Sequence, residues 1–524
     1  MRKWLCLVAV TLVLLSASPA MTQGAQPLPQ LRTKGGARQL FVDNQPFLIL
    51  GGELANSSSS SLDYMQPIWP RLKELNLNTV LVPVSWEMIE PQEGRFDFSV
   101  PDGLIDGARG KGLHIVILWF GSWKNSMSSY VPAWVKRDER RFPRARSADG
   151  MTLEMLTPFS ATNADADARA FAALMRHLRQ FDPQRTVVMV QVENEIGMIP
   201  SARDHSALAE AAFAQRVPAV LLPKGHAAGT WAQVFGGQAD ERFMAWFYAR
   251  YVERVAAAGK AEYPLPMYVN AALVRPGARA GQYPSAGPLP HLFDIWRAGA
   301  PSIDMLAPDI YFPNFVEWAR KYAVPGNALF IPEADRAGQE EAPANAFFAV
   351  GSLDAIGFSP FSIDSIAPDG QHLGEAYAML ASMAPLILSA QQHGTIRGFR
   401  PPVSFDGAVD EALATAELGG YRLTVNFVDP WTSREQQHIA SHGGLAIQLG
   451  PDEFLFAGSG ITVTFAPAEG AGHAGIESAW EGRFESGQWR PGRLLNGDET
   501  HQGRHIRLPP GSFSIQRVRL YRYR

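Results

Sequence analysis

The chain has 524 residues, with 47 Lys and Arg, 51 Asp and Glu, and a formal net charge of −4. A mildly acidic chain argues against nucleic acid or an anionic membrane as the main partner. Apolar residues make up 46% and charged residues 19%, which argues against disorder and against a fibrous repeat. The length leaves room for two or three domains, including a large α/β barrel.

The first 22 residues have the features of an export signal. Arg2 and Lys3 are followed by the apolar stretch 4–15 and by small residues at 18–20. This apolar stretch is too short to cross a hydrocarbon core of ~30 Å. We therefore expect a cleaved leader and an exported protein, periplasmic or secreted, that has no membrane partner after cleavage. Cys6 is the one cysteine and lies in this leader, so the mature chain is expected to lack disulfides and thiolate metal ligands.

Apolar, β-favouring runs recur along residues 27–392 at intervals that leave space for helices, as in a parallel sheet that is buried on both faces. The predicted strands are Phe47–Leu54, Asn78–Trp86, His114–Trp123, Val187–Ile196, Leu265–Leu273, Asp304–Tyr311, Leu329–Asp335 and Ala355–Asp364. The predicted helices between them include Tyr64–Leu75, Asp165–Phe181, Asp240–Ala258 and Asn314–Ala323. Eight strands alternating with helices predict the α/β fold class and a (β/α)8 TIM barrel. The long connections 122–165 and 197–240 are expected to wall a substrate cleft.

The pattern changes after a predicted helix at Gly374–Gln392. Short alternating segments separated by Gly, Pro and Asp turns predict an all-β, sandwich-like C-terminal domain at 393–524. These segments are Tyr421–Phe427, Leu445–Leu449, Glu453–Phe456, Ile461–Phe465 and Phe513–Tyr521. We favour packing against the barrel as its role over an independent sugar-binding module.

Acidic residues stand at many of the predicted strand ends, where the active site of a (β/α)8 enzyme lies. They are Glu53, Glu87, Glu193, Glu195, Asp309, Glu333, Asp335 and Asp364. Each has an alternative role as an ion-pair partner or a loop cap. Glu195 and Glu333 end the fourth and seventh strands and would face each other across the barrel mouth, as the carboxylates of a retaining glycosidase do. Spacing alone does not separate Glu193 from Glu195, because both would point the same way from a regular strand.

The string Gln191–Gly197 resembles the acid/base strand of glycoside hydrolase family 35, a family of retaining β-galactosidases built on (β/α)8 barrels. The resemblance implies that Glu195 is the acid/base, that Glu333 is the nucleophile, and that Asn194 binds the sugar 2-hydroxyl. It extends to Trp86 and to the edge 91–96, and is closest to a bacterial branch with a C-terminal domain of uncharacterised role. Some members of that branch resemble enzymes that remove galactose from xyloglucan side chains.

Two segments depart from the family pattern. Many members have a histidine–tyrosine pair after the first strand, where this chain reads Gly51–Asn56, and an Asn-x-His-Glu-Pro string after the second, where it reads Glu87–Pro91. Both segments would hold the terminal sugar. The resemblance therefore supports the reaction mechanism more strongly than it supports galactose as the sugar.

The two glutamates need different environments in this mechanism. Glu333 must stay ionised, and Tyr311 at the end of the sixth strand is a candidate donor to it. Glu195 must start protonated, so burial or a negative neighbour should raise its pKa. Carboxyl groups ~5–5.5 Å apart would favour retention and ~6.5–9.5 Å inversion.

Aromatic side chains near strand ends can stack on sugar rings or pack in the core. We expect Trp86, Trp119 and Tyr311 to form a sugar platform, and Asn270 either to hold a sugar hydroxyl or to cap a loop. The scattered histidines and the absence of an HExxH motif predict no metal, and the chemistry needs no cofactor.

The sequence therefore predicts a carbohydrate substrate and an exported retaining exo-β-glycosidase, a β-galactosidase acting on plant-type oligosaccharide or polysaccharide. A β-glucosidase or β-mannan-cleaving enzyme of the same clan is one alternative. A barrel that binds carbohydrate without catalysis is another. The sequence does not determine the oligomeric state.

Overall fold

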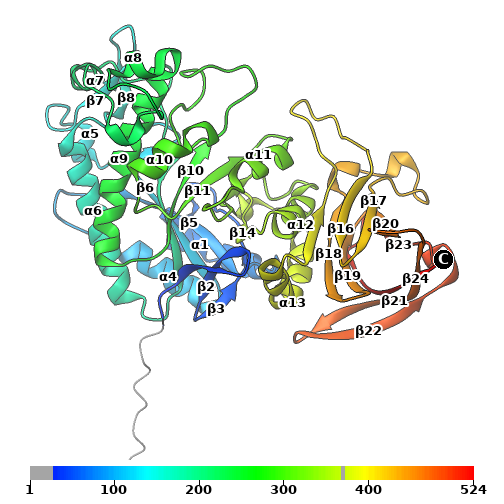
Figure 1. Cartoon of the computed structure of the whole chain (residues 1–524). Helices are drawn as coiled ribbons and strands as arrows, with labels where there is room; N and C mark the ends of the chain where they lie inside the picture. The colour runs from blue at the N-terminus through cyan, green and yellow to red at the C-terminus, as the bar shows by residue number, and fades with distance from the viewer. Residues whose placement is uncertain (1–26, 367–371) are drawn as a thin grey trace, which may run out of the picture.

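The computed structural model describes residues 27–366 and 372–524, so the predicted leader lies outside the described residues. An α/β region and an all-β region lie side by side, with α12 (Ala342–Ser352) and α13 (His372–His393) between them (Figure 1). The chain changes from one region to the other after α13.

Six parallel strands form the larger sheet of the α/β region, in the order β13-β11-β10-β9-β6-β5. Their bounds are β5 Thr79–Ser85, β6 His114–Lys124, β9 Val187–Asn194, β10 Met267–Ala272, β11 Met305–Ile310 and β13 Glu333–Ala334. A second parallel sheet has the order β12-β14-β4, with β4 Ile49–Leu50, β12 Phe330–Ile331 and β14 Gly357–Phe358. The prediction of a parallel α/β sheet is confirmed.

The two sheets meet without forming one continuous ladder. At one junction β12 continues into β13 within residues 330–334. At the other, Glu53 forms an isolated parallel bridge with Leu81, and the Leu81 amide donates to the Gly52 carbonyl at 2.9 Å. The predicted strands at Phe47–Leu54 and Ala355–Asp364 are reduced to two residues each. The sheet is thus curled and parallel, but its strand pairing does not close into a complete barrel.

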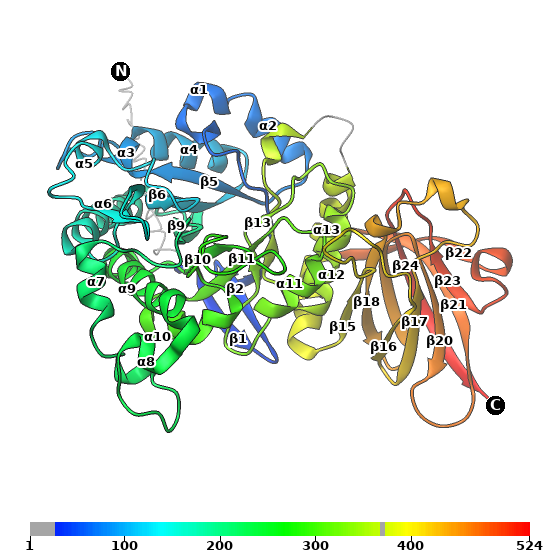
Figure 2. The same cartoon turned by 90° about the horizontal axis from the view of Figure 1, so that it is seen from above.

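Helices cover the outer face of this curled sheet (Figure 2). The remaining helices are α1 Leu62–Met65, α2 Ile68–Glu74, α3 Trp86–Ile89, α4 Ser99–Gly110, α5 Ala133–Lys136, α6 Ala161–Phe181, α7 Ala207–Phe213, α8 Trp231–Phe235, α9 Ala239–Glu262, α10 Phe293–Gly299 and α11 Phe315–Tyr322. The predicted helix at Tyr64–Leu75 is split into α1 and α2 around Pro67, whose ring cannot continue a helix. The long connections hold α5, α7, α8 and the hairpin of β7 Arg144–Arg146 with β8 Thr152–Leu156.

Two hydrophobic cores hold the α/β region together. One fills the inside of the curled sheet and includes Leu81, Phe120 and Phe330. The other lies between sheet and helices. A small antiparallel sheet, β1 Gln30–Lys34, β2 Ala37–Val42 and β3 Gln45–Phe47, adds Leu40 and Val42 to the inner core. It therefore plugs the end of the sheet away from the carboxyl ends of the strands.

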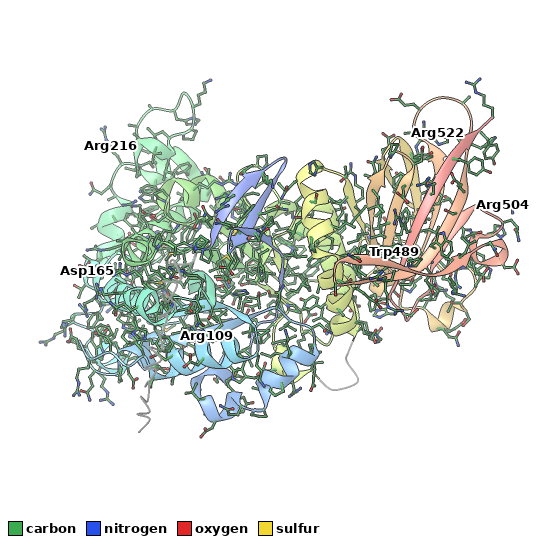
Figure 3. The ribbon with its side chains drawn as sticks, turned by 90° about the horizontal axis from the view of Figure 1, so that it is seen from below. Arg109, Asp165, Arg216, Trp489, Arg504 and Arg522 are labelled. Carbon is green, nitrogen blue, oxygen red and sulfur yellow. The ribbon has the colours of Figure 1, made fainter. Side chains whose placement is uncertain are left out.

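The all-β region has two antiparallel sheets of the orders β15-β18-β19-β24-β21-β22 and β16-β17-β20-β23. The strands are β15 Ile396–Phe399, β16 Ala414–Leu418, β17 Tyr421–Asn426, β18 Gly443–Gly450, β19 Glu453–Ser459, β20 Ile461–Pro467, β21 His473–Glu485, β22 Gln488–Leu495, β23 His505–Leu508 and β24 Ser514–Tyr523. Alternating buried residues from both sheets form a shared core. In Figure 3, Trp489 lies on the side that faces the α/β region, whereas Arg504 and Arg522 lie on the far side.

Within the described residues, α13 is one helix whose length and apolar composition would suffice to cross a membrane. Half of that stretch is buried in the protein, with Leu380 and Ile387 in the core against the sheet. Core helices of globular proteins have the same composition.

Candidate active site

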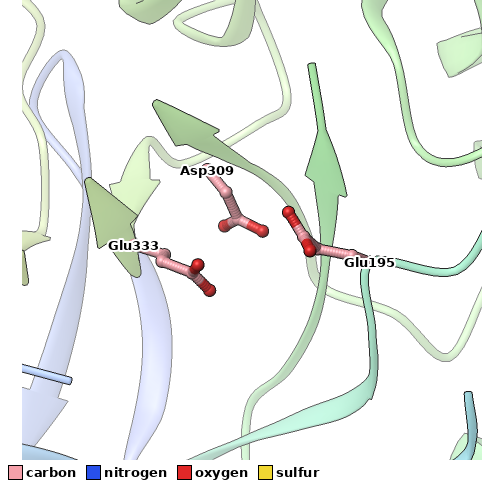
Figure 4. Close-up of side chains that lie close together, drawn as sticks. All are labelled: Glu195, Asp309 and Glu333. Carbon is pink, nitrogen blue, oxygen red and sulfur yellow. The ribbon is translucent and has the colours of Figure 1, made fainter. Parts of the chain in front are cut away.

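Three carboxyl groups meet at the carboxyl end of the larger sheet (Figure 4). Glu195 follows β9, Asp309 lies in β11 and Glu333 begins β13. One carboxylate oxygen from each residue lies within 4.8 Å of the corresponding oxygens of the other two residues. Asp309 and Glu333 are direct partners across the β11–β13 pair, and the three side chains are almost completely buried. The sheet thus brings together Glu195 and Glu333, which the sequence places in different units.

Glu333 receives a hydrogen bond from the predicted donor. The Tyr311 hydroxyl donates to Glu333 Oε1, whereas Glu333 Oε2 is buried without a partner among the described residues. Burial and the Glu333 charge raise the pKa of Tyr311 above its ordinary value, so the phenol keeps its proton. Glu53 is a second neighbour of Glu333, because burial and then the Glu333 charge raise the pKa of Glu53 well above its ordinary value, and its protonated carboxyl group can donate to Glu333.

Glu195 has the environment of an acid. Burial first, and then the Glu333 charge, raises the pKa of Glu195 to about 7, although Lys124 and Asp309 act in the opposite direction. Asn125 Nδ2 donates to Glu195 Oε2 at 2.7 Å and fixes one oxygen of the carboxyl group. Glu195 can therefore hold a proton near neutral pH.

Asn270 links two of the acidic residues. Its Oδ1 accepts from the Glu195 amide at 3.0 Å, and its Nδ2 donates to Asp309 Oδ2 at 2.6 Å. Both ends of the side chain are thus used within the protein, which favours the capping role over direct sugar binding. Asp309 itself has a pKa well above its ordinary value because of burial and then the charges of Glu333 and Glu195.

Asn194 lies beside Glu195, with no exposed surface. Its Oδ1 accepts from Lys124 Nζ at 2.9 Å, and its Nδ2 has no partner among the described residues. Lys124 therefore contacts Asn194, and Asn125 contacts Glu195. We did not predict either residue. The available signal was two polar residues directly after the apolar strand His114–Trp123, where the strand-end rule applies.

Glu193 and Glu195 point in different directions, contrary to the expectation from a regular strand. Both have positive φ angles, 63° and 44°, so the alternation of side chains breaks at the end of β9. Glu193 Oε2 accepts from the Trp123 amide at 2.7 Å, and burial and Asp167 of α6 raise its pKa well above the ordinary value. Glu193 therefore faces the helix layer and Glu195 faces the site.

Two of the predicted platform residues are not available to a sugar. Trp86 and Trp119 have no exposed surface. Their indole groups donate to Glu90 and to Asp167, each at 2.9 Å. The expectation fails because an aromatic residue near a strand end can pack outward against the helices. Tyr311, which is 37% exposed, is the predicted aromatic residue that remains at the site.

Several buried polar atoms around the carboxyl cluster have no partner within the described residues. They are Glu53 Oε1, Gln191 Nε2, Asn194 Nδ2, Tyr268 OH, Asp309 Oδ1, Glu333 Oε2 and Ser359 Oγ. Buried polar atoms are normally hydrogen-bonded, so donors and acceptors without partners at one end of a sheet fit a ligand rich in hydroxyl groups. The three carboxylates also lie close enough to share a cation, and the absence of a metal stays a prediction.

A cavity of about 360 Å³ lies over the end of β5, beside this cluster. Phe120 lines it, and Lys124 Nζ lies 5.1 Å from the centre of the Phe120 ring. Ser85, Met88 and Tyr130 form other parts of its wall. Phe120 is thus the cavity-lining residue that lies near Lys124.

Comparison with known proteins assigns part of the chain. Residues 60–253 match the family 42 glycoside hydrolase model, described as beta-galactosidase, and residues 373–507 match a domain of unknown function (DUF5597). The N-terminal match includes Asn194 and Glu195 but ends before Asp309 and Glu333. Residues 60–253 thus carry the sequence pattern of a β-galactosidase-like glycoside hydrolase. The resemblance to family 35 in particular is not confirmed.

Two curated relatives are beta-galactosidases. The protein from Xanthomonas manihotis is 28% identical over 39% of this chain and 32% of its own length. The protein from an Arthrobacter species is 27% identical over 26% and 20%. The matched part is thus a third or less of each relative. A solved beta-galactosidase from Bacillus circulans sp. alkalophilus has a TM-score of 0.48 at 12% identity, covering 66% of this chain and 57% of that one.

Proposed function

We propose that the protein is a retaining exo-β-glycosidase, a β-galactosidase that removes terminal galactose by double displacement. The observation that carries the proposal is the pair Glu195 and Glu333. The two carboxyl groups face each other in different environments, with at least one oxygen pair within 4.8 Å. Such a close approach favours the separation of ~5–5.5 Å between carboxyl groups in retaining enzymes over the ~6.5–9.5 Å of inverting enzymes. The matches to β-galactosidases support the same reaction class.

The reaction uses the Glu333 oxygen that Tyr311 does not hold. Glu333 Oε2 attacks the anomeric carbon while Glu195 gives its proton to the departing glycosidic oxygen, so the sugar becomes covalently attached and the alcohol leaves. Glu195, now ionised, takes a proton from water, whose oxygen attacks the anomeric carbon and releases Glu333. The Tyr311 hydroxyl holds the other Glu333 oxygen in place throughout.

We propose a (β/α)8 barrel as the structural framework for this reaction. We infer that the parallel strands of the two sheets act as one barrel of eight strands, in which β12 and β13 count as a single strand. The carboxyl ends of these strands form the site, although the strand pairing is interrupted at β4 and β12. The cavity behind Phe120 gives space for part of the group attached to the galactose, and we propose a plant-type oligosaccharide or polysaccharide as substrate.

A panel of aryl β-glycosides tests the proposal, with galactoside, glucoside and mannoside compared for the wild type and Glu333→Gln. Release from the galactoside that is lost in the variant supports both the reaction and the nucleophile. Preferential release from the glucoside or mannoside would keep the mechanism and change the sugar. No release from any of the three would contradict the proposal and favour a binding protein.

A further inference from the structure

The last residue of β6, a buried lysine, holds the end of β9. Lys124 and Asn194 are partners in the pairing of β6 with β9, and Lys124 is 5% exposed. The ammonium group donates to Asn194 Oδ1 at 2.9 Å. It is close enough to Glu53, Glu195 and Asp309 for its charge to act on all three. Lys124 thus belongs to the site, although its ammonium group is hydrogen-bonded to Asn194 and not to one of these three carboxyl groups.

An ammonium group determines which way a neighbouring amide must point. Lysine has three donors and no acceptor, whereas an asparagine amide has an acceptor at one end and donors at the other. Rotating the Asn194 amide by 180° would place its NH2 group against the ammonium group and lose the hydrogen bond. Lys124 therefore keeps Oδ1 on its own side and Nδ2 on the other.

The Asn194 Nδ2 group that results is a buried donor without a partner among the described residues. Leaving a buried donor without a partner is unfavourable, so this position is suited to an acceptor from a ligand. The neighbouring residues repeat the arrangement, since Asn125 Nδ2 donates to Glu195 Oε2. The dipeptide Lys124–Asn125 therefore orients both Asn194 and Glu195.

We infer that Lys124 is a positioning residue that orients the Asn194 amide, so that Nδ2 donates to the hydroxyl group next to the anomeric carbon of the sugar. The inference rests on the proposed function and assigns the polarity of one contact within it. The sugar hydroxyl accepts from Asn194, and Lys124 does not touch the sugar. Removing the lysine then weakens catalysis through that hydroxyl group specifically.

The test compares an aryl β-galactoside with its 2-deoxy analogue. For the wild type, kcat/KM is expected to be about 100-fold higher on the parent substrate, because this contact strengthens at the transition state. In Lys124→Met the preference is expected to fall below about 10-fold, with a larger loss on the parent than on the analogue. An equal loss on both substrates, with the preference retained, would overturn the inference.

A second variant tests the orientation without removing the lysine. Asn194→Leu keeps the approximate size of the side chain and removes the donor, so it is expected to lose the preference for the 2-hydroxyl. Retention of the preference would mean that Asn194 does not donate to that hydroxyl group, and would overturn the inference even if Lys124→Met fails to fold.

The matched control is Lys260→Met. Lys260 Nζ lies 2.6 Å from Asp304 Oδ2 at the opposite end of the sheet, so the preference should stay at the wild-type value. A change in the control as large as that in Lys124→Met would also contradict the inference. A wild type that hydrolyses no aryl glycoside would overturn the proposed function and this inference together. An active wild type with an unchanged preference in Lys124→Met and Asn194→Leu would overturn this inference alone.

Discussion

The end of β9 places one glutamate on each side of the sheet, and the two surroundings differ. Glu193 and Glu195 are both buried, and burial is the first cause of the raised pKa of each. Behind the sheet, Asp167 accepts from the Trp119 indole and the Ser122 amide at 2.9 and 3.0 Å. Glu193 accepts from the Trp123 amide and, when protonated, donates to Asp167.

Polar atoms without a partner among the described residues lie on both sides of the sheet. Behind it they include Glu193 Oε1, and on the inner side they form a larger set. Asp309 Oδ1, Glu333 Oε2 and Asn194 Nδ2 are buried and unpaired among the described residues. A buried acid with a raised pKa is therefore not sufficient to mark a catalytic group. What distinguishes the inner cluster is that three carboxyl groups from different elements converge within 4.8 Å of one another, with an unpaired Asn194 amide donor next to Glu195.

The largest expected effect separates the two clusters directly. Glu333→Gln removes the proposed nucleophile and is expected to lower kcat by on the order of 10⁴-fold or more. Glu193→Gln keeps the shape and a donor toward Asp167, and kcat is expected to stay within about 10-fold of the wild type. Steady-state kinetics on an aryl β-galactoside measure both. Equal losses in the two variants would show that the clusters are not functionally distinct.

Loss of the acid is expected to depend on the leaving group. Glu195→Ala should lower kcat/KM by about 10²–10⁴-fold for a substrate with a poor leaving group. The loss should be much smaller for a dinitrophenyl galactoside, which needs little protonation. Added azide should react with the glycosyl-enzyme in the space left by the side chain and give the β-azide product, identified by NMR. Formation of the α-azide would contradict retention.

Stability should report the buried proton on Glu195. A pKa raised from 4.5 to about 7 means that the native state binds this proton more tightly than the unfolded state. The stability is therefore fully present below pH 4.5 and is lost as the pH rises through about 7. Glu195→Gln removes this loss, so it should gain on the order of 3 kcal/mol over the wild type between pH 4.5 and pH 8.

Urea unfolding of the two proteins at several pH values measures this gain. A constant stability difference between them across that range would contradict the raised pKa.

The pH profile should show the smallest of these effects. Glycosylation needs protonated Glu195, so kcat/KM is expected to fall about tenfold per pH unit above about pH 7. Lys124 lowers the pKa of Glu195, so Lys124→Met should move this limb to higher pH. A limb that does not move, or that moves to lower pH, would contradict the assignment of Lys124 as a neighbour of the acid.

The positions of Glu195 and Glu333 follow from the sequence because each ends a short apolar run, and parallel strands bring such ends to one edge. The opposite directions of Glu193 and Glu195 depend on two positive φ angles, which no residue type at these positions indicates. The burial of Trp86 and Trp119 depends on which side of the sheet the helices occupy. Lys124 and Asn125 lie one and two residues beyond the end of the predicted third strand, within a long connection.

The central claim is that Glu333 forms a covalent bond to the sugar while Glu195 acts as the acid. The most direct test is incubation with a 2-deoxy-2-fluoro-β-galactosyl fluoride, followed by mass spectrometry of the intact protein and its peptides. The account predicts one added fluorogalactosyl group, located on Glu333 and absent in Glu333→Gln. Turnover of galactosides without any trapped adduct, or an adduct on Glu195, Asp309 or Glu53, would contradict it.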